Sequence, residues 1–218
     1  CCHNPTGIDP TAEQWELIAD AVTEAGALPL LDFAYQGFAD GLEEDTKGLR
    51  ALLARDRTML VASSFSKNFA LYDERVGALS IVGADADETA TLLSHAKATI
   101  RSNYSNPPAH GGEIVATVLS DDELSERWVA EVGTMRDRIN GNRARFVDGL
   151  QAAGAPGNHE SLLRQRGMFS LLPLGEERVA RLRDDYGVYV VGKGRVNVAG
   201  LTADNLEPVC RAIAAVTS

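Results

Sequence analysis

The stretch from residue 63 to residue 77 reads Ser63-Ser64-Phe65-Ser66-Lys67-Asn68-Phe69-Ala70-Leu71-Tyr72-Asp73-Glu74-Arg75-Val76-Gly77 and follows an apolar, strand-like segment. One lysine, Lys67, stands among hydroxyl side chains and eight residues before Arg75. The hydroxyls of Ser64 and Ser66 and the Arg75 guanidinium can hold a phosphate dianion. The Lys67 amine is then free to form a Schiff base with a carbonyl. This combination indicates a site for a phosphate-bearing aldehyde.

Pyridoxal phosphate is the cofactor that such a site suggests. Lys67 by itself would more often be a solvated surface lysine, and Arg75 could instead form a structural ion pair with Asp73 or Glu74. The interpretation therefore depends on what the rest of the chain contains.

Length and composition are those of a globular protein. With 218 residues, 44% of them apolar and 24% charged, the chain can bury a substantial core. A formal charge of -10 argues against a nucleic-acid surface. The apolar stretches are too short for a membrane span and the start does not read as a signal peptide, so we expect a cytoplasmic protein with no membrane partner.

Cysteines and histidines do not form a metal or disulfide pattern. Cys1, Cys2 and Cys210 have neither zinc nor disulfide spacing, and we expect them to be reduced and structural. The histidines lie apart from one another without ligand spacing, so no metal site is expected; they are His3, His95, His110 and His159.

Alternating helices and strands predict an α/β domain in the first part of the chain. Thr11 and Gln14 form a capping box for a helix that stops at Gly26. A further helix is expected near 47–55, and strands at 28–32, 58–63 and 77–82. In such a fold the functional residues lie in loops after the carboxyl ends of the strands, which is where we place Asp32, Tyr35, Ser64 and Lys67.

The pattern changes in the second part of the chain. Helices are expected near 87–100 and 113–119, followed by a long amphipathic helix over 122–153 with candidate bends at Gly133 and Gly141. Beyond Pro156 we expect a smaller α+β domain, with strands at 168–172, 188–191 and 195–198 and helices at 176–186 and 205–216. The predicted domains are 1–134 and 135–218, bridged by the 122–153 helix.

Five motifs, in this order, carry a resemblance to a known family. They are Cys2-His3-Asn4-Pro5-Thr6-Gly7, Leu30-Leu31-Asp32-Phe33-Ala34-Tyr35-Gln36-Gly37-Phe38, the stretch 63–77, Ile100-Arg101-Ser102-Asn103-Tyr104-Ser105-Asn106-Pro107-Pro108, and Gly194-Arg195-Val196-Asn197-Val198-Ala199-Gly200. Together they resemble the aspartate/aromatic aminotransferase family of fold-type I pyridoxal-phosphate enzymes, over essentially the whole chain. In that family the first motif lies near the middle of a subunit, so the chain looks like a C-terminal half. The fold implied is the C-terminal part of the large, mostly parallel-sheet domain plus a small α+β domain.

The cofactor-binding residues implied are Asn4, Asp32, Tyr35, Ser64, Ser66, Lys67, Arg75 and Ser105. Asp32 would keep the ring nitrogen protonated, because an opposite charge raises the pKa of that nitrogen. Tyr35 and Asn4 would donate to the ring oxygen, and the Asn4-Pro5 bond is expected to be cis. Lys67 would hold the cofactor as a Schiff base and then carry a proton, which makes it the catalytic residue. Ser105 would touch the phosphate of a neighbouring subunit.

The substrate-binding residues implied are Asn4, Arg101, Phe169 and Arg195. Arg195 would clamp the α-carboxylate of an amino-acid or 2-oxo-acid substrate, for which a planar two-donor fork is suited. Arg101 would reach into the neighbouring subunit's site and bind the distal carboxylate, which implies a homodimer with shared active sites. Phe169 would line the pocket, although Phe169 and Ser105 could equally be packing residues.

The resemblance favours aspartate aminotransferase, an enzyme of amino-acid metabolism that transfers the amino group of L-aspartate to 2-oxoglutarate, giving oxaloacetate and L-glutamate. Aromatic aminotransferases of the family also keep an Arg101 equivalent, so an aromatic-amino-acid aminotransferase stays open as an alternative. The segments 105–108 and 195–198 look closer to aspartate enzymes. A third alternative is a catalytically silent fragment that lacks the N-terminal half of its site.

Overall fold

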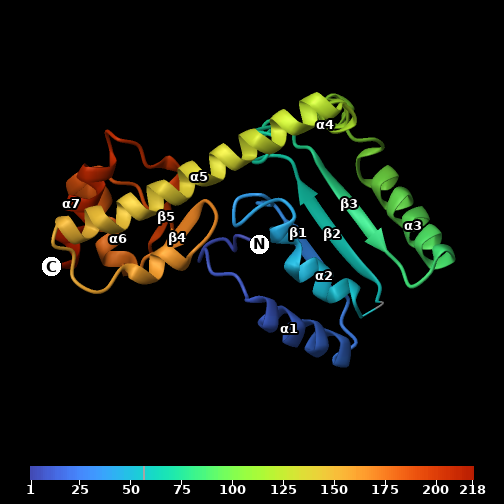
Figure 1. Ribbon diagram of the computed structural model, residues 1–218, viewed down its shortest axis with the longest axis horizontal. Coiled ribbons are helices and arrows are strands. Elements are labelled where there is room, and N and C mark those ends of the chain that lie inside the picture. Colours follow the sequence, from blue (N-terminus) through green and yellow to red (C-terminus); the bar gives the residue numbers. More distant parts are fainter. Residues whose placement is uncertain (56) are drawn as a thin grey trace. The chain divides into compact units, whose positions relative to one another are not determined.

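The computed structural model describes residues 1–55 and 57–218 and divides them into two compact units (Figure 1). The first unit comprises Cys1, Pro10–Gly37 and Gly41–Val132, and the second comprises Cys2–Asp9, Phe38–Asp40 and Gly133–Ser218. Helix α5, Asp122–Ala152, contributes residues to both units and continues through Gly133 and Gly141, so neither glycine ends it. The domain boundary after residue 134 stays a prediction.

The first unit is built on a three-stranded sheet. Its strands are β1 (Leu30–Phe33), β2 (Met59–Ser64) and β3 (Gly77–Val82), in the order β1-β2-β3. The pairing of β1 with β2 is parallel and that of β2 with β3 is antiparallel. Strands β1 and β2 therefore bring their carboxyl ends to the same edge of the sheet.

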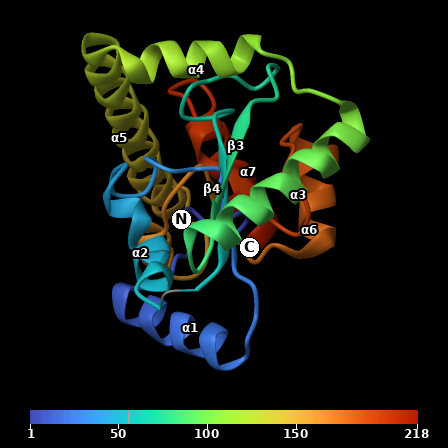
Figure 2. The same cartoon turned by 90° about the vertical axis from the view of Figure 1, so that its right-hand side faces the viewer.

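Helices flank this sheet on two sides. Helices α1 (Ala12–Glu24) and α2 (Lys47–Leu53) lie on one side of β1 and β2, and α3 (Ala86–Tyr104) lies alongside β3 on the other (Figures 1 and 2). One apolar core joins α1 and α2 to β1 and β2; it consists of Ala19, Leu31, Phe33, Ala51, Leu52, Met59 and Val61. A short 3-10 helix, η1 (Glu44–Thr46), precedes α2, and α4 (His110–Ser120) follows α3.

The capping box predicted for the first helix is confirmed. The Thr11 hydroxyl accepts from the backbone N–H of Gln14, and the Gln14 side chain accepts from the backbone N–H of Thr11. These two bonds satisfy donors that a helix N-terminus leaves free, and they set the start of α1. Asp85 caps α3 in a similar way through the N–H of Glu88.

The second unit joins a small antiparallel sheet to helices. Strands β4 (Phe169–Leu171) and β5 (Arg195–Asn197) pair with Phe169 opposite Asn197. The helices are α6 (Gly175–Tyr186), α7 (Leu206–Thr217), the 3-10 turns η2 (Glu160–Arg164) and η3 (Val198–Gly200), and the later part of α5. Helices α5 and α7 approach closely at Gly149, where an added Cβ would lie 2.7 Å from the Cys210 sulfur.

One strand prediction is wrong. Residues 188–191 form no strand, and only Val191 makes a single bridge to Arg195. Two of the apolar side chains that suggested the strand are solvent-exposed, Tyr189 at 81% and Val191 at 58%, and the other two, Val188 and Val190, are only partly buried. The segment therefore lacks the buried face that would hold a strand in register.

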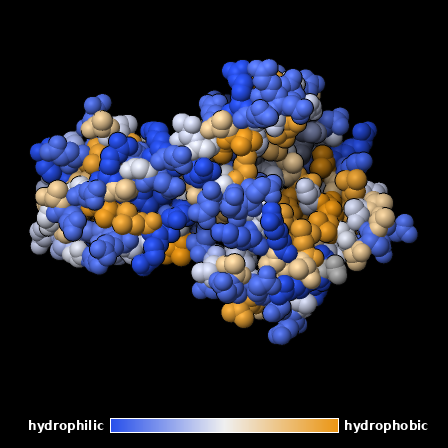
Figure 3. Space-filling view, viewed as in Figure 1, coloured by the Kyte–Doolittle hydropathy of each residue, from blue (hydrophilic) through white to orange (hydrophobic). Residues whose placement is uncertain are grey.

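The surface of the first unit carries apolar side chains. Figure 3 shows them gathered over the part of the view where β3 and α3 lie. The exposed set includes Leu79 of β3, 52% exposed, and Leu93 of α3, 44% exposed, and α3 has no buried residue. Exposed apolar surface of this kind is typical of surfaces that contact another chain or segment. None of the helices in the described residues has the length and apolar character needed to cross a membrane.

Candidate active site

Lys67 and Tyr35 meet at the carboxyl edge of the sheet. Tyr35 lies in the turn after β1, and Lys67 lies in the turn after β2. The Lys67 Nζ atom is 4.7 Å from the centroid of the Tyr35 ring. An ammonium at this distance is attracted to the ring face, so the contact orients the half-buried lysine side chain. The parallel pairing of β1 and β2 is what brings these two turns together.

The turn that carries Lys67 is held by residues that the sequence analysis did not select. Asn68 is buried, and its Nδ2 donates to the carbonyl of Gln36 at 3.3 Å. Trp128 of α5 donates its indole N–H to the Asn68 carbonyl at 2.8 Å. The Trp128 ring also stacks on Phe69, with centroids 4.6 Å apart and planes at 23°. A tryptophan in an amphipathic helix is expected to serve the packing of the core. Only the tertiary contacts of Trp128 reveal that it also holds the turn of Lys67.

Ser64 and Ser66 lie on either side of the end of β2. The Ser64 hydroxyl accepts from the backbone N–H of Ser66 at 3.3 Å, which leaves its own hydrogen available to a ligand. Ser66 is buried, 6% exposed. These two hydroxyls and the Lys67 amine thus come from four consecutive residues at the end of one strand.

Arg75 ends the loop that leads into β3, and its backbone has a φ of +52°. Its Nη1 donates to the Tyr72 carbonyl at 3.0 Å. Among the described residues, no ion pair joins Arg75 to Asp73 or Glu74, and Glu74 instead accepts a contact from His110 Nδ1 at 2.9 Å. The hydrogen bond to Glu74 raises the pKa of His110 above its ordinary value.

Asp32 stands one residue before the end of β1, opposite Ala62 of β2. Its carboxylate accepts the N–H of Ala34 at 3.0 Å, and the side chain is exposed on the face opposite the buried Leu31 and Phe33. The prediction that Asp32 and Ser64 lie in loops needs a small correction, because both are within the strands, near their carboxyl ends.

Arg101 and Ser105 lie at the C-terminal end of α3, and both are exposed. The Ser105 N–H donates to the Arg101 carbonyl at 3.2 Å, and Ser105 has a φ of +72°. In the part of the chain that the structure describes, no hydrogen bond or ion pair joins either side chain to Lys67 or Asp32. The structure therefore groups Arg101 with Ser105 but leaves their predicted roles untested.

Arg195, Phe169 and Asn4 come together in the second unit. Arg195 begins β5 and Phe169 begins β4, and the register places their side chains diagonally on the same face of the two-stranded sheet. The Arg195 guanidinium carbon is 4.6 Å from the centroid of the Phe169 ring. Its Nη1 donates to Asn4 Oδ1 at 3.0 Å. The Asn4-Pro5 bond is cis, as the resemblance implied.

The segment that carries Asn4 is closed into a loop by Asp9. The Asp9 carboxylate accepts the backbone N–H groups of Cys2, at 2.6 Å, and His3, at 2.9 Å. The N–H of Arg166 donates to the Gly7 carbonyl at 2.7 Å. Gly7 has a φ of +66°, and a Cβ there would lie 2.7 Å from the Phe169 carbonyl oxygen, so the close approach requires glycine.

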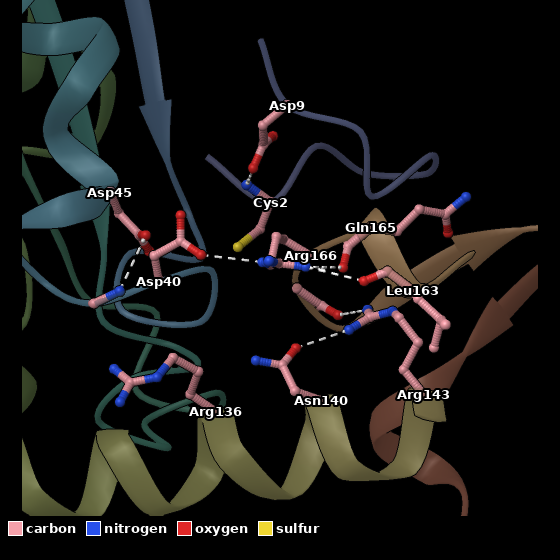
Figure 4. Close-up of polar contacts among 12 residues, drawn as sticks. Cys2, Asp9, Asp40, Asp45, Arg136, Asn140, Arg143, Leu163, Gln165 and Arg166 are labelled. Carbon is pink, nitrogen blue, oxygen red and sulfur yellow. Dashed lines mark hydrogen bonds and ion pairs between the residues drawn. The ribbon is translucent and has the colours of Figure 1, made fainter. Parts of the chain in front are cut away.

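Two arginines border this segment (Figure 4). Arg166 forms an ion pair with Asp40 at 3.1 Å. Arg143 is almost fully buried and donates to the Gly167 carbonyl and to Asn140. Burial, and then the nearby charge of Arg166, lower the pKa of Arg143 to about 10.

The first unit is an α/β unit with a lysine at the carboxyl edge of a parallel strand pair. The second unit has an arginine beside an asparagine. The chain belongs to the aminotransferase class I and II family, whose sequence pattern matches residues 1–213.

Individual relatives fall into two groups. The chain is 56% identical to an aspartate aminotransferase of Escherichia coli (strain K12), over 99% of this chain and 54% of that protein. It is 47% identical to a tyrosine aminotransferase of Klebsiella pneumoniae, over 99% of this chain and 54% of that protein. The chain thus spans about half the length of the curated relatives it matches.

Solved structures resemble the fold closely. An aromatic-amino-acid aminotransferase from Burkholderia pseudomallei, covalently bound to pyridoxal phosphate, matches with a TM-score of 0.96 and 49% identity, over 100% of this chain and 55% of that chain. A mitochondrial aspartate aminotransferase from Trypanosoma brucei matches with a TM-score of 0.95 and 40% identity, over 100% of this chain and 57% of that chain. The α/β fold of the aminotransferases is therefore the fold of this chain.

Proposed function

We propose that this chain is the C-terminal part of a pyridoxal-phosphate-dependent aminotransferase that exchanges amino groups between L-aspartate and 2-oxoglutarate, giving oxaloacetate and L-glutamate. The observation that carries the proposal is the position of the Lys67 amine, 4.7 Å over the Tyr35 ring, on the turn after a strand whose parallel neighbour carries Asp32. A lysine, a phenol and a carboxylate at one sheet edge are the groups that such a cofactor needs.

The residues present fit this cofactor. The donors suited to a phosphate dianion are the Ser64 hydroxyl, whose hydrogen is available, the Ser66 hydroxyl, and the guanidinium of Arg75. Arg75 uses one of its five N–H donors on the Tyr72 carbonyl. Ser105 at the end of α3 would contribute a further hydroxyl from a neighbouring subunit.

Bound pyridoxal phosphate supplies an electron sink for the bond that breaks at the substrate α-carbon. Lys67 is proposed to hold the cofactor through its amine and, once released, to move a proton to and from that carbon. Asp32 would keep the ring nitrogen charged through its carboxylate. The Tyr35 hydroxyl and the Asn4 amide would donate to the ring oxygen.

Arg195 is proposed to bind the substrate α-carboxylate. Its guanidinium lies over the Phe169 ring and donates one N–H to Asn4, and these two contacts fix the plane of the guanidinium. The other N–H groups remain to pair with a carboxylate. Asn4 also donates its amide to that carboxylate, and Phe169 lines the pocket. Arg101 pairs with the distal carboxylate in the site of a neighbouring subunit.

Substrate choice is proposed to favour aspartate. Identity is 56% to an aspartate aminotransferase of Escherichia coli (strain K12) but 46% to an aromatic-amino-acid aminotransferase of the same organism. This difference supports aspartate, and an aromatic-amino-acid aminotransferase remains the alternative because relatives of both kinds match over 99% of this chain.

The assembly is proposed to be a homodimer with shared active sites. The exposed apolar side chains over β3 and α3 support a surface that another chain or another part of the same polypeptide covers. A cytoplasmic location stays a prediction. The alternative to this proposal is that the 218 residues are a catalytically silent fragment, and an assay of the 218 residues alone tests that alternative.

A chimera tests the proposal: residues 1–218 placed behind the N-terminal part of the Escherichia coli aspartate aminotransferase. Rates with L-aspartate and with L-phenylalanine, each with 2-oxoglutarate, should be higher for L-aspartate. A preference for L-phenylalanine would select the aromatic alternative. No transamination by a folded chimera that binds the cofactor would contradict both.

A further inference from the structure

Two neighbouring polar residues of α5 are buried in the second unit without belonging to the proposed site. Asn142 is 3% exposed and Arg143 is 2% exposed. Removing a guanidinium from water is unfavourable unless its donors are paired. The partners of Arg143 that the structure gives are neutral oxygens rather than carboxylates. An arginine held in this way needs an explanation beyond filling space.

Arg143 brackets the start of β4. Its Nη2 donates to the Gly167 carbonyl, and its Nε lies 3.5 Å from the Ser170 hydroxyl oxygen, a long contact. These two acceptors stand on either side of Phe169, whose ring lies under the Arg195 guanidinium. Arg143 therefore holds the strand segment that presents this ring.

Asn142 holds the residues that follow β5. Its Nδ2 donates to the carbonyls of Val198, at 3.3 Å, and Leu201, at 2.8 Å. Its Oδ1 accepts from Arg145 Nη2 at 2.6 Å, so both ends of the amide are engaged. Since Arg195 begins β5, Asn142 fixes the far end of the strand that carries it.

Asn142 and Arg143 hold segments that are hydrogen-bonded to each other. The N–H of Val198 donates to the Met168 carbonyl at 2.8 Å, and β4 and β5 pair throughout their lengths. A rotation or shift of either strand would change the position of the Arg195 guanidinium over the Phe169 ring. Adjacent residues of one helix, Asn142 and Arg143, thus hold both strands of this two-stranded sheet.

We propose that Asn142 and Arg143 are positioning residues that set the orientation of the Arg195 guanidinium against Phe169 and thereby the affinity of the site for a substrate carboxylate. This inference rests on the proposed function, because it assumes that Arg195 binds that carboxylate. Neither residue is proposed to contact the substrate or cofactor.

The test uses the chimera and compares five variants: Arg143→Met, Arg143→Lys, Asn142→Ala, Ser170→Ala and Arg138→Ala. Succinate serves as the probe, because it carries two carboxylates and lacks an amino or oxo group that could react. The measurements are the inhibition constant of succinate, KM and kcat for L-aspartate, and the extent of cofactor attachment to Lys67 after borohydride reduction. Arg138 is the matched control, since it lies on the same helix and donates to Ala199 from an exposed position.

We expect Arg143→Met and Asn142→Ala to weaken succinate binding and to raise KM by about 10- to 100-fold, the scale of a misplaced binding group. Arg143→Lys should recover part of this loss because it restores one donor, and Ser170→Ala should weaken succinate binding by a smaller factor. Attachment of the cofactor to Lys67 should match that of the unsubstituted chimera in every variant. A residue that only stabilised the fold would instead lower attachment and binding together.

Unchanged succinate binding in Asn142→Ala and Arg143→Met, with Lys67 still labelled, would overturn the inference. A loss in Arg138→Ala as large as in Arg143→Met would overturn it as well. Should Arg143→Met fail to fold, Arg143→Lys and Ser170→Ala decide, because both conserve most of the side-chain volume. Failure of the proposed function has a different signature, namely no cofactor on Lys67 in the unsubstituted chimera.

Discussion

The amine of Lys67 lies 4.7 Å from the centroid of the Tyr35 ring, although the two residues follow different strands of the sheet. Parallel pairing of β1 and β2 aligns the two turns, and the hydrogen bond from Asn68 Nδ2 to Gln36 joins them a second time. The position of the lysine is therefore a property of the sheet and of both turns together. This arrangement makes the lysine sensitive to substitutions that do not touch it.

Trp128→Phe should weaken this arrangement without removing the aromatic ring. The substitution keeps a ring that can stack on Phe69 but removes the donor to the Asn68 carbonyl, which then loses a hydrogen bond worth about 1 kcal/mol. Denaturant unfolding of the chimera should show a loss of about that size. Cofactor attachment to Lys67 should fall at low cofactor concentration, because the turn is less well held.

Val129→Ala provides the control for Trp128, since Val129 is the next residue of the helix and is 47% exposed. If Val129→Ala lowered attachment as much as Trp128→Phe, the indole contact would not be what holds the turn.

Gly7→Ala should destabilise the chimera more than Gly26→Ala. Both glycines have a φ near +60°, at +66° and +62°, so an alanine pays a similar backbone cost at either position. A Cβ at Gly7 would also lie 2.7 Å from the Phe169 carbonyl oxygen, whereas nothing lies within 4 Å of one at Gly26. The difference in unfolding free energy isolates the clash, and we expect it to be at least about 1 kcal/mol.

Succinate affinity gives a second measurement on the same pair of variants. Gly7→Ala should weaken it because the segment carries Asn4, while Gly26→Ala should leave it unchanged. Equal effects of Gly7→Ala and Gly26→Ala on stability and on succinate affinity would show that the segment around Gly7 accommodates the added Cβ.

His110 should titrate above the ordinary range of a histidine. The hydrogen bond and the charge of Glu74 favour the protonated ring and raise the pKa of His110. Because the pKa is raised in the folded state, the contribution of this contact to stability is fully present below the unfolded pKa. That contribution is lost as the pH rises through the folded value. Proton NMR titration of the ring resonances measures the shift directly.

Glu74→Gln should return the His110 titration toward its ordinary midpoint, since the glutamine keeps an acceptor oxygen but lacks the charge. Glu113→Gln is the comparison, because Glu113 makes the smallest of the contributions to the raised pKa. A His110 midpoint that did not move in Glu74→Gln would show that the contact does not exist in solution.

Much of the fold could be predicted from local signals. The capping box at Thr11 and Gln14 and the apolar runs of the first unit are contained in a few consecutive residues, and the structure has them where they were expected. Residues 188–191 were misjudged because β-branched and aromatic residues also occur on exposed segments. Pattern alone does not say whether Tyr189 has a core to pack against.

The candidate site was predictable only in part. The short motifs reveal residues whose chemistry is unusual for their surroundings, such as Lys67 among serines. They do not reveal Asn68 and Trp128, or Asn142 and Arg143, whose tasks exist only through partners far away in the sequence. Asparagine and arginine on a long helix are typical of an exposed face, so their burial can be recognised only in the tertiary structure.

The lysine to which the cofactor attaches can be identified chemically. The chimera is mixed with sub-stoichiometric pyridoxal phosphate, reduced with borohydride and digested, and the modified lysine is identified by peptide mass spectrometry. Lys67→Ala removes the proposed attachment point, and Lys97→Ala removes an exposed lysine of α3 as the control.

We expect modification of Lys67 in the unsubstituted protein and in Lys97→Ala. In Lys67→Ala we expect a lower yield of bound cofactor, with no other lysine modified in its place. Modification spread over many lysines, or an equal yield of bound cofactor in Lys67→Ala, would contradict it.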